Sequence, residues 1–356
     1  MRIIRSIAAL ILIVLVVIYI MEKVENKPEE VIRDDIYLIN EKSNLLQSKI
    51  TPEKTTSSTL TEENIFSWMG KSKQLLLDNL GKPSRVDLSA YGYQWWVYQD
   101  ISNQYIQFGI DNSEIKIIYT TGEVVGTDSV RVGQSYEAIN QQYKFRNKVT
   151  YSEGITSYTF RLNEEDLRMR PLVKINEDTF IQFYFDTFTS KLSSIRFLSA
   201  DILLKHRPYE IEYRGDLPNE PDLSDEEWTK VEKGMEQQIV DITNVMRKLH
   251  GKGLLGWEES VSNVAYHHSK DMAENNYFSH YSLNGDGLKE RLEVENVFYT
   301  AAGENIAAQY PDAPAAMQGW LNSEGHREAL FNNEYTHIGV GVYRFYYTQN
   351  FLGKDI

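Results

Sequence analysis

The chain has 356 residues, enough for two or three domains that each bury a core of their own. Its 51 Asp and Glu against 37 Lys and Arg give a formal net charge of −14, which argues against nucleic acid as a partner because phosphate binding needs a basic surface. There are no cysteines, so disulfides, a lipid anchor on cysteine and thiolate metal sites are excluded.

The N-terminus predicts a membrane anchor. From Ile3 to Met21 only Arg5 is charged, and the run is close to the roughly 20 apolar residues that cross a bilayer as a helix. Arg2 and Arg5 lie at its start, so the positive-inside rule keeps this end cytoplasmic and places the rest of the chain outside. A cleaved signal peptide, which would release the protein, is the alternative, but the run ends in large residues where small ones are needed. We expect residues 1–21 to be an uncleaved transmembrane signal anchor.

Residues 22–62 are polar and charged, with prolines and a Thr/Ser-rich stretch at residues 55–59. This composition is typical of a stalk or linker that holds a folded domain away from the membrane. A weakly amphipathic helix over residues 29–48 is the alternative for part of the segment.

Residues 63–206 are predicted to be a duplication of small α+β modules. In each copy a Gly-x-Ser turn begins a short helix, and alternating apolar residues then predict a pair of antiparallel strands. The strongest evidence is a shared Ile-Gln-Phe sequence, which lies in Tyr105–Ile110 and again in Phe180–Phe185. The partner strands are expected at Ile115–Tyr119 and Leu192–Phe197, after hairpin turns.

The first copy also contains an aromatic run, Tyr91-Gly-Tyr-Gln-Trp-Trp-Val-Tyr98. Aromatic side chains are common on half-buried strands, so a packed sheet between the two copies is the preferred interpretation, and a glycan-stacking surface is the alternative. No acid–histidine or nucleophile–base pair recurs in residues 63–206. We interpret this region as a non-catalytic interaction or positioning module.

Residues 207–227 are acidic and contain three prolines, which predicts a linker. At its end, Ser224-Asp-Glu-Glu227 fits a capping box and predicts the start of a helix that runs to about His250. Residues 228–356 form the predicted C-terminal domain.

Helices and strands are both expected in this domain. A second helix, over about Glu259–Asn275, carries His268 on its apolar face, where a core histidine bonded to backbone or carboxylate is the expected role. Ala301–Ala308 is expected to be a turn or short helix that carries Glu304. Ile338-Gly-Val-Gly-Val342 alternates like a central strand whose glycines allow close packing of another element, and a partner strand follows.

Four short motifs follow one another along this domain: Asn276-Tyr-Phe-Ser-His280, Gly303-Glu-Asn305, Ser323-Glu-Gly-His-Arg327 and Tyr347-Thr-Gln349. Together they resemble the CAP superfamily of cysteine-rich secretory, antigen 5 and pathogenesis-related proteins over roughly Met235–Phe351. The resemblance implies an α-β-α sandwich. Residues 63–206 likewise look like the CAP-associated domain of membrane-anchored proteins from Gram-positive bacteria, so the whole chain is expected to be α+β.

The family's cleft is lined by two histidines and two acids, and the resemblance assigns to it His280, Glu304, Glu324, His326, Tyr346 and Gln349. His280 and Glu304 match the family motifs directly. Glu324 is the nearest candidate for the second acid, one position later than in many eukaryotic members. Tyr346 stands where those members carry the second histidine, and His326 is the residue that could supply an imidazole instead.

Imidazole and carboxylate together suit Zn²⁺ or a similar cation, so His280, His326 and Glu304 are the metal-ligand candidates. Hydrolysis would need a metal-bound water and a base such as Glu304, which makes His280 and Glu304 the catalytic candidates. The chain has no His-Glu-x-x-His, no Gly-x-Ser-x-Gly and no cysteine nucleophile. We therefore predict a cell-surface protein that binds a metal, lipid, peptide or envelope partner. A metal-dependent hydrolase of peptides or cell-wall material is the alternative.

Overall fold

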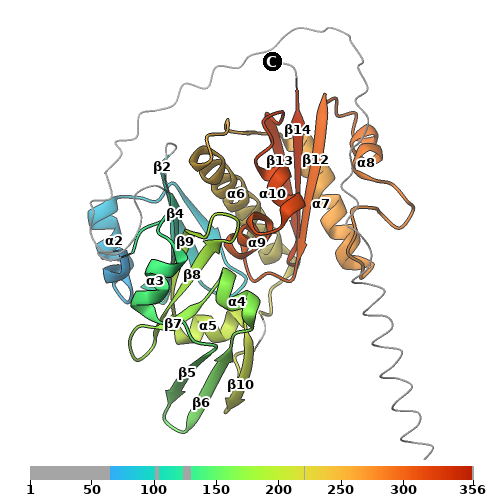
Figure 1. The fold of residues 1–356 in the computed structure, drawn as a ribbon. Coiled ribbons are helices and arrows are strands. Elements are labelled where there is room, and N and C mark those ends of the chain that lie inside the picture. The colour runs from blue at the N-terminus through green and yellow to red at the C-terminus, as the bar shows by residue number, and fades with distance from the viewer. Residues whose placement is uncertain (1–64, 101–103, 123–129, 220, 355–356) are drawn as a thin grey trace, which may run out of the picture. The chain divides into compact units, whose positions relative to one another are not determined.

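The computed structural model describes residues 65–100, 104–122, 130–219 and 221–354 (Figure 1). The predicted anchor, residues 1–21, and the predicted stalk, residues 22–62, lie outside them. Within the described part of the chain, no helix has the length and apolar character needed to cross a membrane.

The N-terminal region is built on a seven-stranded antiparallel sheet of order β1-β2-β3-β4-β9-β8-β7, and a second sheet has the order β10-β6-β5. Its elements are η1 (Ile65–Trp68), α2 (Lys73–Leu80), β1 (Arg85–Leu88), β2 (Gln94–Asp100), β3 (Gln104–Asp111), β4 (Glu114–Gly122), α3 (Tyr136–Tyr143), β5 (Lys148–Glu153), β6 (Thr156–Arg161), α4 (Glu164–Met169), β7 (Leu172–Lys174), β8 (Thr179–Asp186), β9 (Lys191–Ser199), α5 (Ala200–His206) and β10 (Glu210–Arg214). Within the predicted linker, residues 207–227, the structure has one strand, β10, which pairs along its whole length with β6.

The two predicted hairpins, β3–β4 and β8–β9, are confirmed, and both contain a shift in strand register. Each has a register shift at the same aligned position, between Gly109 and Ile110 in one and between Tyr184 and Phe185 in the other. In each copy the preceding helix is capped by a serine, Ser72 or Ser135. The copies are nevertheless not separate modules, because β4 pairs with β9 and one sheet continues through both.

The aromatic run is part of the packed sheet, as the preferred interpretation predicted. Tyr93, which directly precedes β2, and Trp95 on β2 are buried in a cluster with residues of β5, β6 and α5. Trp96 and Tyr98 point to the opposite face and pack against the cluster that includes Leu76 of α2. Both faces of β2 are therefore covered, mostly by other parts of the same region and, at Val97, by a cluster that includes residues of the C-terminal region.

The C-terminal region forms three layers around a four-stranded sheet of order β11-β13-β14-β12 (Figure 1). Its elements are α6 (Asp225–Leu249), β11 (Gly256–Trp257), α7 (Glu259–Glu274), α8 (Leu288–Val294), β12 (Ala301–Ala308), α9 (Ala313–Leu321), α10 (Glu324–Leu330), β13 (His337–Tyr343) and β14 (Tyr346–Gly353). Helix α7 covers one face of this sheet, and α6 and α9 cover the other.

Alternation along β13 explains how the layers meet. Ile338, Val340 and Val342 are fully buried in the cluster that contains the apolar residues of α6 and α9. Gly339 and Gly341 face the other way, and a Cβ on either would collide with the backbone of α7 at Val261–Ser262 or Ala265–Tyr266. The predicted close approach of another element to these glycines is confirmed.

The expectation of a turn or short helix at Ala301–Ala308 is wrong, because this segment is strand β12. It pairs in antiparallel register with β14 over all eight residues. Its four alanines favour a helix in isolation, but hydrogen bonding to β14 and burial in the sheet outweigh that local preference. The register sets Glu304 opposite Asn350.

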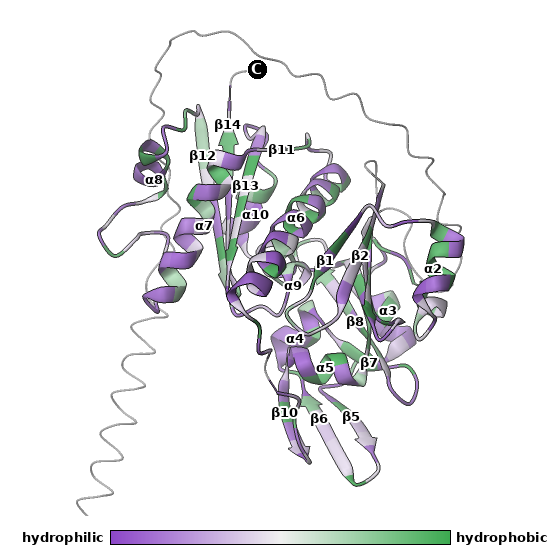
Figure 2. Ribbon diagram, turned by 180° about the vertical axis from the view of Figure 1, so that it is seen from behind, coloured by the Kyte–Doolittle hydropathy of each residue, from purple (hydrophilic) through white to green (hydrophobic). Residues whose placement is uncertain are grey.

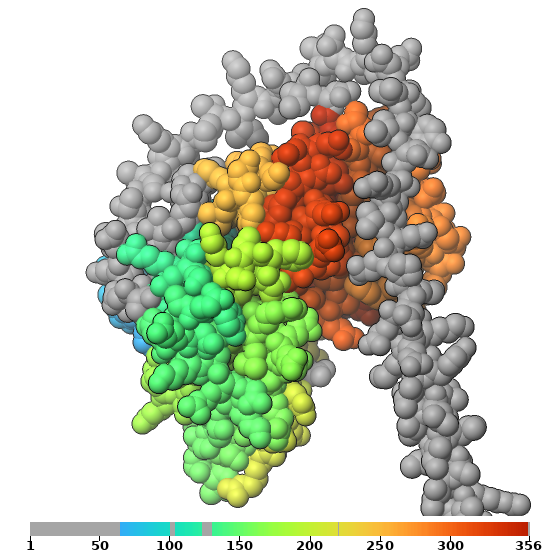
Figure 3. Space-filling view, in the orientation of Figure 1, coloured from blue at the N-terminus to red at the C-terminus, as the bar shows by residue number. Residues whose placement is uncertain are grey.

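Helix α6 lies between the two regions (Figure 2). Gly234 leaves room for the side chain of Asp87 on β1, and the Asp87 carboxylate accepts a hydrogen bond of 2.9 Å from Gln238. In a second contact Arg196 on β9 and Asp312, the N-cap of α9, form an ion pair of 2.7 Å in which the side chains are 1% and 3% exposed. Figure 3 shows the surfaces of the two regions meeting directly.

Candidate functional site

Glu304 is the centre of the predicted site. It lies on β12, and its side chain is only 4% exposed. One carboxylate oxygen, Oε1, accepts a hydrogen bond of 2.9 Å from Nδ1 of His280. The other, Oε2, accepts one of 2.6 Å from Nη2 of Arg291, while Nε2 of His268 lies 3.9 Å from Oε1. The buried negative charge is thus held by a cation and two imidazoles.

Arg291 on α8 also organises the loop that carries His280. Its Nη1 donates to the backbone carbonyl oxygens of His280, at 3.0 Å, and of Asp286, at 3.1 Å. One guanidinium group therefore joins the loop after α7, the helix α8 and the strand β12. This multiple use suits arginine, which presents five N–H donors in a rigid plane.

These contacts decide the charge of Glu304. Burial by itself raises the pKa of this carboxyl group, but the hydrogen bond from His280 and the positive charge of Arg291 outweigh it and hold the pKa below its usual value. Burial lowers the pKa of His268, against the opposing effect of Glu304. Glu304 is therefore ionised at neutral pH, and His268 is neutral.

The orientation of His280 follows from the same pair. Because Nδ1 donates to Glu304, the neutral ring carries its lone pair on Nε2. The His280 side chain is 37% exposed, so the imidazole is accessible to solvent while the carboxylate behind it is not. This is the arrangement in which a carboxylate orients a histidine toward a metal or another electron-accepting group.

His326 on α10 is brought to the same place, since its ring centre lies 6.5 Å from that of His280. Asn305 fixes this end of α10, because its Nδ2 donates to the backbone oxygen of His326 at 3.1 Å. The same Nδ2 donates to Oε1 of Gln349, also at 3.1 Å. Gln349 is fully buried and donates to Thr243 at 2.7 Å, so it supports the sheet behind the site.

Two other predicted cleft residues are not joined to this group. Glu324 is exposed in the first turn of α10, and among the described residues no hydrogen bond or ion pair connects it to His280 or Glu304. Tyr346 pairs with Ala308, four residue pairs along the strand from Glu304, which corresponds to about 13 Å. The structure therefore brings His280, Glu304 and His326 together and places Tyr346 farther along β14.

Sequence reasoning missed Arg291. It lies on an ordinary amphipathic helix, and no motif in the sequence connects it to a carboxylate thirteen residues later. His268 was expected to be a core histidine bonded to backbone or carboxylate, and this is confirmed: it is buried, and Nε2 lies 3.0 Å from the carbonyl oxygen of Ser279. The described ranges contain no cluster of three or more His, Asp or Glu placed to hold a metal ion.

An α-β-α sandwich whose edge strand β12 carries a glutamate paired with a histidine of the loop after α7, docked on a separate sheet, defines the class of this protein as a CAP-domain protein with an N-terminal companion domain. Residues 240–353 match the cysteine-rich secretory protein (CAP) family, and residues 69–209 match the CAP-associated N-terminal family. The chain belongs to the CAP family, as its motifs predicted.

The similar proteins are bacterial. The uncharacterized membrane protein YlbC of Bacillus subtilis (strain 168) is 43% identical over 316 residues, which are 88% of this chain and 91% of that protein. The uncharacterized protein YkwD of the same organism is 36% identical over 121 residues, 33% of this chain and 47% of that protein.

Two solved structures share the fold. One is an extracellular protein containing a SCP domain from Bacillus anthracis, with a TM-score of 0.78, 40% identity, and coverage of 86% of this chain and 100% of that one. The other is a cysteine-rich secretory protein from Staphylococcus aureus, with a TM-score of 0.72, 27% identity, and coverage of 82% and 96%.

Proposed function

We propose that this protein is a membrane-anchored, extracellular CAP-domain protein that binds a ligand at the His280–Glu304 pair and does not turn it over. The observation that carries this proposal is the ion pair of 2.6 Å between Arg291 and Glu304. Arg291 donates to Oε2 of Glu304, and His280 donates to Oε1, so both carboxylate oxygens already have a protein partner.

This arrangement favours binding over catalysis. A general base works best when its pKa is near the working pH and when it can reach the proton that it removes. Glu304 meets neither condition, since its pKa is lowered and its side chain is buried behind His280. Its role in the proposal is to orient His280 and to keep the Nε2 lone pair turned to the ligand.

The ligand in this proposal is a group that accepts the imidazole lone pair. A peptide N–H, a hydroxyl group or a divalent cation such as Zn²⁺ would each do so. A cation would be shared by His280 and His326, the two imidazoles whose ring centres are 6.5 Å apart. Donor atoms of the molecule bound with it would complete the coordination of the cation.

The cellular location is part of the proposal. It rests on the apolar run of residues 3–21 with arginines at its start, and it agrees with the description of YlbC as a membrane protein and of the Bacillus anthracis relative as extracellular. The bound partner would then be a component of the cell envelope.

The alternative function is a metal-dependent hydrolase of peptides or cell-wall material. The proximity of His280 and His326 is the observation that favours it, because a metal held by two imidazoles would lower the pKa of a bound water. Glu304 would then have to leave Arg291 in order to act as a base.

Two measurements on the full chain in detergent test these functions. Isothermal calorimetry with ZnCl2 should detect binding that His280→Ala abolishes and that His267→Ala, which removes an exposed histidine on α7, leaves intact. Turnover of peptides or wall fragments should be absent with and without zinc. Hydrolysis that disappears in Glu304→Gln would contradict the binding function and support the hydrolase.

A further inference from the structure

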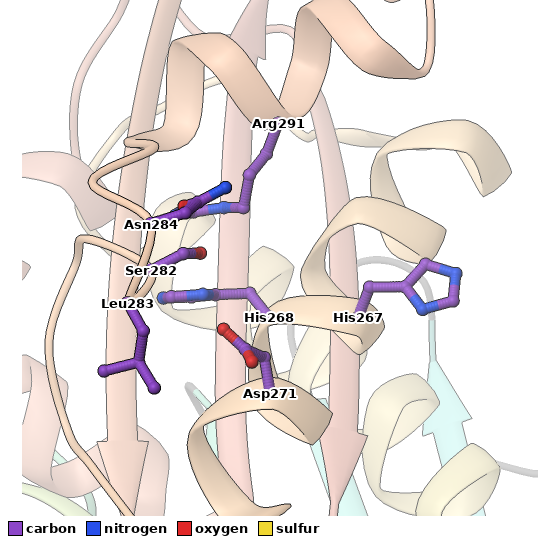
Figure 4. A pocket seen from close by; sticks show the side chains of 7 residues that line it. All are labelled: His267, His268, Asp271, Ser282, Leu283, Asn284 and Arg291. Atoms are coloured by element: carbon purple, nitrogen blue, oxygen red, sulfur yellow. The ribbon is translucent and has the colours of Figure 1, made fainter. Parts of the chain in front are cut away.

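A second concave site lies beside the His280–Glu304 pair. It is a pocket of about 410 Å³ between α7, α8 and the loop that joins them, within the size range of small-molecule sites. Figure 4 shows His268 and Asp271 pointing from α7 toward this loop, and Arg291 reaching the same space from α8, whereas the His267 ring turns away. Ser282, Leu283 and Asn284 of the loop complete the lining.

Two polar atoms of the lining side chains are buried and have no partner within the described protein. They are Nδ1 of His268 and Nε of Arg291. The remaining nitrogen atoms of these two residues are all engaged, with Ser279, His280, Asp286 and Glu304. A buried polar group without a partner is destabilising, so these two atoms indicate where a ligand would be held.

One of these two atoms accepts a hydrogen bond and the other donates one. Because Nε2 of His268 faces the carbonyl oxygen of Ser279, it carries the proton, and Nδ1 is left as an acceptor. Nε of Arg291 can only donate. A single hydroxyl group can donate to the first and accept from the second, whereas a carboxylate can only accept and an ammonium group can only donate.

The charges around the pocket also favour a ligand that carries hydroxyl groups. Arg291 is already neutralised by Glu304 at 2.6 Å, and Asp271 on the opposite wall adds one negative charge, which disfavours an anion, while the N–H donor at Nε of Arg291 disfavours a cation. Six of its seven lining residues are polar, and an apolar ligand would desolvate them at a cost. Leu283, which is 69% exposed, supplies an apolar edge.

We propose that this pocket binds a saccharide, a neutral ligand with many hydroxyl groups. One hydroxyl bridges His268 Nδ1 and Arg291 Nε, a second donates to Asp271, and the C–H face of the sugar ring lies on Leu283. This site goes beyond the proposed function, since it requires neither the Nε2 lone pair of His280 nor a metal ion.

Saturation-transfer difference NMR on the full chain tests the proposal, with the disaccharide of N-acetylglucosamine as the probe and a detergent that has no sugar headgroup. The ring protons of the probe should receive saturation from the wild-type protein. Asp271→Asn and Leu283→Ser should each weaken binding by about threefold to tenfold, a change of about 0.7–1.4 kcal/mol. Leu254→Ser, which also alters a half-exposed leucine but one outside the lining, should have no effect.

Three results would overturn the saccharide site: no saturation of the disaccharide, binding that neither Asp271→Asn nor Leu283→Ser weakens, or binding of inorganic phosphate in its place. His280→Ala separates this site from the proposed function. That variant should lose the calorimetric signal with ZnCl2 and keep the disaccharide signal. Both lining variants change exposed or half-exposed residues, and their thermal unfolding verifies that they fold.

Discussion

Glu304 shows how a single buried charge can be held inside a protein. Removal of a carboxylate from water is costly, and the cost is offset only by close opposite charge and hydrogen bonds. Arg291, His280 and His268 provide these from three different segments of the chain. One of the residues that hold this charge, Arg291, contacts Glu304 without belonging to a family motif.

Arg291→Met is expected to destabilise the fold by about 3 kcal/mol, because it leaves the Glu304 carboxylate buried without its cation. Urea unfolding measures the loss. The double variant Arg291→Met/Glu304→Gln should regain part of it, since the uncompensated charge is gone. Equal stability of the single and double variants would show that the ion pair does not carry the effect.

His206 gives a pH dependence of stability. Burial lowers its pKa from 6.5 to about 3, with Asp312 opposing and Arg196 assisting, and its Nε2 lies 3.0 Å from the hydroxyl of Tyr93. Between these two pH values the unfolded chain binds a proton here that the folded chain does not. The free energy of unfolding should fall as the pH drops through this window, by about 1.4 kcal/mol for each pH unit within it.

Urea unfolding at several pH values, compared between wild type and His206→Gln, measures this contribution. The variant should lose less stability on acidification, because glutamine does not titrate. His267→Gln, which changes an exposed histidine, should follow the wild-type curve. An unchanged slope in His206→Gln would assign the acid sensitivity to other groups.

At the scale of elements, the contact of α7 with β13 decides the geometry of the site, because the loop with His280 begins where α7 ends. The two glycines of β13 allow the helix backbone to rest directly on the strand. The sequence motif Ile-Gly-Val-Gly therefore encodes a helix-to-sheet distance, and through it the position of His280 relative to Glu304.

Gly341→Ala should destabilise the protein by several kcal/mol, since its Cβ would meet the backbone of α7 at Ala265–Tyr266, which has no room to move. Thermal or urea unfolding measures the change. Gly325→Ala on α10 is the matched control, because no atom lies within 4 Å of the place that its added methyl group would take. It should be neutral or stabilising by up to about 1 kcal/mol.

At the scale of the whole molecule, the CAP-associated region and the CAP domain share a core. One cluster of buried side chains contains Val97 and Tyr119 of the first region together with Met235, Met317 and Phe351 of the second. The Arg196–Asp312 pair and the hydrogen bond of 2.9 Å between Asp186 and Arg327 join β9 and β8 to α9 and α10. Arg327 follows His326 directly, so the N-terminal region also supports the helix that carries this histidine.

We expect both regions to unfold in one transition. Arg196→Met should cost about 3–5 kcal/mol because it leaves Asp312 buried without its partner, and it should shift the unfolding of both regions together in urea. Lys230→Met, which breaks the exposed pair of 2.8 Å with Glu226, should leave the unfolding transition nearly unchanged because solvent screens that pair. Two separated transitions would contradict the shared core.

Much of the organisation could be predicted from sequence. The hairpins around Ile-Gln-Phe, the capping box at Ser224, the glycines of β13 and the family motifs all encode local or repeated structure, which depends on residues close in the chain. The errors have one cause. Ala301–Ala308 and Glu210–Arg214 form strands because partners far away in the chain, β14 and β6, supply the hydrogen bonds.

The sequence by itself determined the family, the order of the regions and the identity of His280 and Glu304 as a pair. Only the tertiary structure decided what that pair can do. Arg291, on a helix that no motif marks, neutralises Glu304 and turns it into a support for His280, and the strand register moves Tyr346 away from it. Electrostatic partners and register depend on contacts between distant segments, and a linear pattern carries no direct record of them.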